Sequence, residues 1–250
     1  MDRPQVPDDG ADAVHLRFVR LTGRRTFLRW SGAAAGAALL AACDRSTTEP
    51  DADTKPSLLD AAAQGQVTIN VGNDIGILNF AYALEQLEAA FYIKVVQDFY
   101  PGASGEETHL LADIKNHEVV HREFFRAALG SAAIPALAVD FSAVDFGSRA
   151  SVLGTAQALE DTGVGAYNGA AQFLGNGDYL EAAGKIVSLE ARHASAIRDV
   201  FGRNFAPRAF DEALTFEQVL RRAGPFIATP LNIINSPTAG STASAQEMTS

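Results

Sequence analysis

The chain of 250 residues contains only one cysteine, Cys43. A single thiol cannot form a disulfide within the chain, so the folded part must be stable without one. It also leaves no set of thiolates that would favour the softer metals. Any metal site in this sequence would therefore be built from carboxylates and imidazoles.

The chain also lacks a hydrophobic run long enough to cross a membrane. Its most apolar stretch, Trp30–Ala42, has 13 residues, whereas a spanning helix needs about 20. Arg24 and Arg25 precede this stretch, and with Phe27 and Leu28 they resemble a twin-arginine export signal. The alternatives are an uncleaved membrane anchor or an incidental basic N-terminus.

The same stretch ends in Leu40-Ala41-Ala42-Cys43, which resembles a bacterial lipobox. In lipoproteins with that motif the cysteine becomes the lipidated first residue of the mature chain. We therefore expect residues 1–43 to direct the protein to the Tat translocase. Cys43 would then attach it to membrane lipid at the periplasmic or extracellular face. The alternative is an ordinary cleavage site with an incidental cysteine.

Basic residues are scarce relative to acidic ones. The chain has 20 Lys and Arg against 30 Asp and Glu, a formal charge of −10. Removal of residues 1–43 would take away six basic and four acidic residues and leave −12. Binding of nucleic acid depends on basic patches, so no nucleic-acid partner is expected. The charge suits a protein that holds cations, although a solvated acidic surface explains most of it.

Helical periodicity dominates the middle of the chain. Apolar residues recur at alternating spacings of three and four in four long segments, and a shorter helix is expected near 215–223. The four segments run approximately over 74–99, 105–129, 149–174 and 178–201. The expected domains are a signal segment (1–43), a flexible tether (44–73), a helical domain (74–228) and a disordered tail (229–250).

The connections between these segments predict the topology. Short turns at 101–102 and 175–177 contain proline or glycine and favour two antiparallel hairpins. The longer stretch 130–148 joins the hairpins, which predicts an all-α four-helix bundle with one long crossover. Ser104 with Glu107 predicts a capping box for the second helix, and Asp178 is expected to cap the fourth.

Two Glu-x-x-His steps lie on the apolar faces of these helices. Residues three apart share a helix face, so the glutamate and histidine of one step can reach the same point. A lone glutamate on each of the other two helices completes the ligand set of a four-helix di-metal carboxylate centre. The six candidate ligands are Glu85, Glu118, His121, Glu160, Glu190 and His193.

Burial of these groups would be costly without compensating charge. An unpartnered buried carboxylate costs several kcal/mol. Two cations would remove that cost, with Glu118 and Glu190 as bridging ligands and Glu85 and Glu160 as terminal ones. The alternatives are solvated helix faces or a metal-free bundle that uses Glu–His and Glu–Tyr hydrogen bonds.

The first and third helices form an internal repeat. Glu85 is followed seven residues later by Tyr92, and Glu160 by Tyr167. Related hairpins would place the metal pair on a pseudo-twofold axis. The two tyrosines are expected to donate hydrogen bonds to the metal ligands, with plain core packing as the alternative.

Glu88 departs from this repeat, because the matching residue is Gly163. The absent side chain at Gly163 leaves room for an inward Glu88, which would be a seventh ligand, a base or a proton relay. The alternative is that Glu88 turns out to solvent. His117, beside the apolar face, and His109, near the start of the second helix, are expected on the surface.

The segments Leu78–Tyr92, Leu159–Tyr167 and Glu190–His193 resemble the ferritin-like superfamily. The similarity is greatest to exported bacterial ferritin-like proteins related to plant desiccation-related proteins, and it covers 74–228. It implies a ferritin-like bundle with a di-iron or di-manganese site at the six candidate ligands.

Activities within that superfamily differ widely, so the fold does not fix the reaction. One expectation is redox chemistry with a small oxidant, peroxide or dioxygen, of the peroxidase, catalase or ferroxidase type. The other is a non-enzymatic metal-binding or stress-protective lipoprotein. An iron-storage cage fits poorly, because a lipid tether and long ends would obstruct a closed shell.

Overall fold

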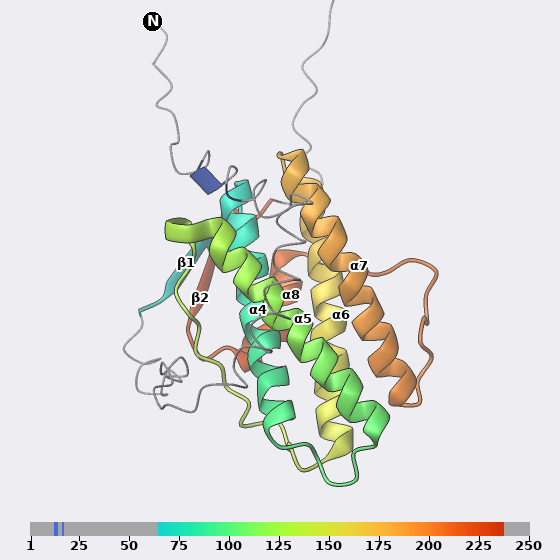
Figure 1. Cartoon of the computed structure of the whole chain (residues 1–250). Helices are drawn as coiled ribbons and strands as arrows, with labels where there is room; N and C mark the ends of the chain where they lie inside the picture. Colours follow the sequence, from blue (N-terminus) through green and yellow to red (C-terminus); the bar gives the residue numbers. More distant parts are fainter. Residues whose placement is uncertain (1–12, 15–16, 18–64, 238–250) are drawn as a thin grey trace, which may run out of the picture.

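Four long helices make up most of the computed structural model, which describes residues 13–14, 17 and 65–237 (Figure 1). They pack in pairs, and a short fifth helix follows them. These helices are α4 (Asp74–Gln97), α5 (Gly105–Leu129), α6 (Arg149–Ala170), α7 (Gly177–Val200) and α8 (Phe216–Ala223). The predicted ferritin-like arrangement, two antiparallel hairpins joined by a crossover with a short C-terminal helix, is confirmed.

Side-chain caps fix where the helices begin. The predicted capping box at α5 is present, since the backbone N–H of Glu107 donates to the Ser104 hydroxyl and the Glu107 carboxylate accepts from the Ser104 N–H. At α7 the prediction was wrong by two residues. Asn176 is the N-cap and accepts from the N–H of Asp178, which lies in the first turn.

Two expected helices also end earlier than predicted. α4 ends at Gln97, before the turn at 101–102, and α6 passes into the 3-10 turn Ala171–Phe173. That tighter winding precedes the glycine-containing connection to α7.

Two amide side chains of α4 hold the crossover in place. Asn79 donates to the carbonyl of Ala132 at 2.9 Å and accepts from the N–H of Ile134 at 2.7 Å. Gln86 accepts from the N–H of Leu137 at 2.8 Å. Backbone groups of the crossover therefore find their partners on α4, which anchors the second hairpin relative to the first.

A small parallel sheet was not anticipated. Strand β1 (Val67–Asn70) pairs with β2 (Leu231–Ile234) in the register Val67↔Leu231 (Figure 1). The prediction of a flexible tether over 44–73 and a disordered tail over 229–250 is therefore wrong for the residues of these two strands. Residues 44–64 and 238–250 of these two segments lie outside the described residues, as does nearly all of the expected signal segment.

The C-terminal extension packs against the bundle through small residues of α6. A side chain at Gly169 would collide with the backbone of Leu214, because a Cβ atom added at Gly169 would lie 1.8 Å from the carbonyl oxygen of Leu214. The N–H of Leu214 donates to the carbonyl of Gly165 at 2.9 Å. Beyond it, Phe216 of α8 meets Phe80 of α4 edge to face at 5.0 Å.

The core divides into two apolar clusters with a polar layer between them. On α5, Ile114 belongs to one cluster and Phe125 to the other, with Glu118 and His121 between them. The same order holds on α7, where Ile186 and Ile197 belong to different clusters and Glu190 and His193 lie between them. The polar layer therefore lies halfway along the bundle, covered at both ends by apolar side chains. No helix in the described part of the chain is long and apolar enough to cross a membrane.

Candidate metal centre

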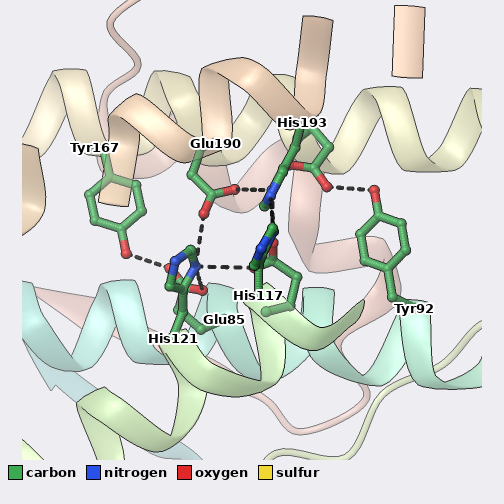
Figure 2. A network of polar contacts seen from close by, with 9 residues as sticks. Glu85, Tyr92, His117, His121, Tyr167, Glu190 and His193 are labelled. Atoms are coloured by element: carbon green, nitrogen blue, oxygen red, sulfur yellow. Dashed lines mark hydrogen bonds and ion pairs between the residues drawn. The ribbon is translucent and has the colours of Figure 1, made fainter. Parts of the chain in front are cut away.

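All six side chains predicted as ligands meet in this polar layer (Figure 2). Each of the four long helices contributes, α5 and α7 with two residues and α4 and α6 with one. The four glutamates have no solvent exposure, and His121 and His193 are 9% and 4% exposed. The layer is thus a closed assembly of carboxylates and imidazoles.

The first group surrounds Nδ1 of His121. This atom lies 3.0 Å from Oε1 of Glu190, 3.3 Å from Oε2 of Glu85 and 3.5 Å from Oε2 of Glu118. The four ligand atoms come from three helices and all lie within 4.8 Å of one another. A cation at their centre would have one nitrogen and three oxygen ligands.

The second group repeats this pattern around Nδ1 of His193. Here the distances are 2.9 Å to Oε1 of Glu118, 3.4 Å to Oε2 of Glu160 and 3.5 Å to Oε2 of Glu190. Glu118 and Glu190 therefore offer one oxygen to each group. That is the geometry of two bridging carboxylates between two neighbouring cations.

The inward atoms also lack hydrogen-bond partners. Although the contacts are short, no hydrogen bond is formed by the following buried atoms: Nδ1 of His121 and His193, Oε2 of Glu85 and Glu160, and both carboxylate oxygens of Glu118 and Glu190. Buried polar atoms are otherwise nearly always paired, and unpaired charges are costly. The residues therefore fit a pair of cations, and the donor set of oxygens with one imidazole per position suits iron or manganese.

Without cations, protons on the imidazoles supply the positive charge. Burial opposes protonation of His193, but Glu118, Glu160 and Glu190 outweigh it and raise the pKa of His193 to about 12. Burial raises the pKa of Glu85 to about 8, even though His121 opposes that rise. A cation pair entering this layer would therefore displace protons.

Two tyrosines cross between the helix pairs to hold the terminal glutamates. Tyr92 of α4 donates to Oε1 of Glu160 at 2.5 Å, and Tyr167 of α6 donates to Oε1 of Glu85 (Figure 2). Burial and the facing carboxylates raise the pKa of both phenols well above 10. The tyrosines thus remain donors and fix which oxygen of each glutamate faces inward.

Glu88 is buried, so its side chain points into the bundle and does not turn out to solvent. It is 3% exposed, and a Cβ atom at Gly163 would lie only 2.9 Å from its Oε1. It belongs to neither group of ligand atoms. Burial, with further contributions from the four ligand glutamates, raises its pKa well above 4.5, which favours the protonated carboxyl group.

The expectation for His117 was wrong. This side chain is half-buried, and its Nδ1 lies 3.0 Å from Nε2 of His193, with the two rings nearly parallel at 6° (Figure 2). Burial, together with His193 and His121, lowers the pKa of His117. The sequence feature that could have revealed this contact is the position of His117, immediately before Glu118 and one turn before His121. His109 is exposed, as predicted.

Comparison with known proteins agrees with this geometry. The family model described as "Ferritin-like domain" matches residues 73–203, which contain the four long helices and all six candidate ligands. No curated protein matches the sequence at a significant level.

Proposed function

Since this chain belongs to the ferritin-like domain family, we propose that it binds two iron or manganese ions and uses them in a redox reaction with peroxide or dioxygen. The single observation that supports this most strongly is the set of inward atoms that form no hydrogen bond. They form two overlapping groups that share Glu118 and Glu190, which is the number and connection that a dinuclear centre needs.

The charges of the layer balance for two divalent ions. Four carboxylates give −4 when both histidines are neutral, and two divalent cations cancel that charge. A bound pair of iron or manganese ions would supply two electrons when both pass from the divalent to the trivalent state. Reduction of peroxide to two waters needs two electrons and two protons, so the protein must also deliver protons.

The residues around the ligands suit that task. Glu88 is buried in the polar layer against Gly163, and burial raises its pKa well above 4.5, which favours a protonated carboxyl group. Tyr92 and Tyr167 keep their glutamates oriented, and the apolar clusters at both ends exclude bulk water. The protein's part would be to hold the ligands, restrict access and store a proton at Glu88.

A second candidate is a non-enzymatic metal-binding or stress-protective protein. The observation that favours it is the enclosure of the site, because the four ligand glutamates have no exposed surface. In that case the ions would serve only to stabilise the bundle, as structural metals do.

We also propose that residues 1–43 export the protein through the Tat pathway and that Cys43 carries lipid. The support is the order of motifs: Arg24 and Arg25, a short apolar stretch and then the cysteine. Tat carries folded proteins, so metal would be loaded before export. This would place the protein among exported ferritin-like lipoproteins similar to desiccation-related proteins, at the periplasmic or extracellular face.

The deciding experiment is metal analysis of protein purified from its own host, followed by peroxide and oxygen consumption assays. We expect two iron or manganese ions per chain. Glu118→Ala and Glu190→Ala should each lose both ions, because each glutamate serves both groups. Glu181→Ala is the matched control, since Glu181 lies on α7 with a side chain 67% exposed.

The outcomes separate the candidates. Less than about half an ion per chain after anaerobic loading would contradict metal binding altogether. Two bound ions with no consumption of peroxide or oxygen would contradict the redox function and leave the structural one.

A further inference from the structure

The two halves of the metal centre differ beside the bridging ligands, in addition to the difference between Glu88 and Gly163. His117 precedes the bridging residue Glu118 on α5, and Leu189 precedes the bridging residue Glu190 on α7. Each metal position otherwise has one histidine, one terminal glutamate held by a tyrosine, and the same two bridges. The pseudo-twofold relation is therefore broken by an imidazole on one side only.

His117 reaches the ring of a candidate ligand. Nδ1 of His193 faces three carboxylates, so its remaining ring nitrogen, Nε2, points away from the polar layer toward Nδ1 of His117 at 3.0 Å. The parallel rings, with centroids 5.2 Å apart, also limit rotation of His193. Both ring nitrogens of His193 thus have a partner, Nδ1 among the carboxylates and Nε2 at His117.

Within the described part of the chain, the other candidate ligand, His121, has no such partner. Nδ1 of His121 faces its three carboxylates in the same way. However, among residues 65–237 no hydrogen bond reaches Nε2 of His121. The His121 side chain is 11% exposed, compared with 5% for His193.

This difference has a chemical consequence for metal affinity. A histidine that binds a metal through Nδ1 keeps its proton on Nε2, and an acceptor for that proton fixes the tautomer and orientation of the ring and makes it a stronger ligand. Removal of such an acceptor weakens metal binding by about 10–100-fold. Nδ1 of His117 lies at hydrogen-bond distance from Nε2 of His193 and can be this acceptor when the proton of the His117 ring is on its Nε2.

We propose that His117 is a positioning residue that makes the two metal positions unequal, so that the position at His193 binds more tightly and fills first. This rests on the proposed function, since it requires two ions in the polar layer. The residue acts through His193 and does not itself contact the ions.

The test is a titration of the metal-free full chain with Mn²⁺, measured by calorimetry and by electron paramagnetic resonance at one equivalent. The unmodified protein should show two binding steps separated by about 10–100-fold in affinity. After one equivalent of Mn²⁺, most protein molecules should therefore hold one ion and few should hold two. His117→Leu should weaken only the tighter step, by the same factor, so that the two steps merge. Leucine is the residue at the matching position of α7.

Two further variants distinguish the hydrogen bond from general packing. His117→Asn places an amide oxygen near the position of Nδ1 and should keep the two steps apart. Leu189→Ala changes a partly buried residue at the matching position and should also keep them apart. Melting of the metal-free variants confirms that each one is folded.

The outcomes are distinguishable from failure of the proposed function. Absence of metal binding in the unmodified protein contradicts the dinuclear centre itself. Two bound ions whose steps remain equally separated in His117→Leu contradict the role of His117 alone. The same conclusion follows if Leu189→Ala merges the steps as completely as His117→Leu does.

Discussion

Replacement of Gly163 by alanine should reveal how tightly Glu88 is packed against α6. In an exposed helix interior, alanine stabilises relative to glycine by about 0.5–1 kcal/mol. At this position the new Cβ would lie 2.9 Å from Oε1 of Glu88 and 3.7 Å from its Cδ. The carboxyl group would have to move, and overpacking of a buried site typically costs about 1–3 kcal/mol.

We therefore expect Gly163→Ala to leave the free energy of unfolding unchanged or to lower it by up to about 2 kcal/mol, because overpacking opposes the helix-propensity gain. The matched control is Gly184→Ala on α7, where no atom lies within 4 Å of the added Cβ. That change should raise the free energy of unfolding by about 0.5–1 kcal/mol, as in other exposed helix interiors. Urea unfolding of the metal-free proteins, followed by circular dichroism, measures both values.

A double-mutant cycle makes the comparison specific to the contact. In a Glu88→Ala background the obstructing carboxyl group is gone, so Gly163→Ala should become stabilising, with a coupling energy of about 1–3 kcal/mol. Equal effects of Gly163→Ala in both backgrounds would refute the contact. The larger Gly163→Leu should also reduce metal loading, as measured by elemental analysis.

Other predictions follow from the same geometry. Glu85→Ala and Glu160→Ala should each remove mainly one ion, because each glutamate faces one group only; elemental analysis that found both ions lost would contradict this. Tyr92→Phe and Tyr167→Phe should weaken metal binding by about 10-fold or more in calorimetric titrations, through loss of the hydrogen bonds to these glutamates. Metal binding should release protons and weaken as the pH falls, because protons occupy the layer in the metal-free state; calorimetry in buffers of different ionisation enthalpy would count them, and a count of zero would refute it. Cys43→Ser should release the protein from membranes or leave an unprocessed precursor, and unchanged fractionation and mass would argue against lipidation.

The candidate ligands could be predicted because each of them depends on one helix at a time. Glu118 and His121 share a face with Ile114 and Phe125, so the sequence alone indicates that they point inward. Repetition of this pattern on four helices left a common buried layer as the simplest arrangement. Glu88 could be suspected for the same reason, although only the packing against Gly163 decides its direction.

The features that were missed depend on contacts between distant segments. His117 lies off the apolar face of its own helix, and only the packing of α5 next to α7 brings it to His193. The two strands have four residues each, and Thr68 meets Asn232 across 164 positions of sequence. No local periodicity marks such a pair, since its stability comes from the partner strand.

The unequal halves of the polar layer have an evolutionary consequence. If two identical chains each supplied one hairpin, every substitution would appear twice, and both metal positions would have to change together. In this single polypeptide each hairpin can change independently. Glu88 stands opposite Gly163, and His117 has its counterpart in Leu189. Because both hairpins belong to one chain, one half can carry a buried carboxyl group and a histidine partner that the other half lacks.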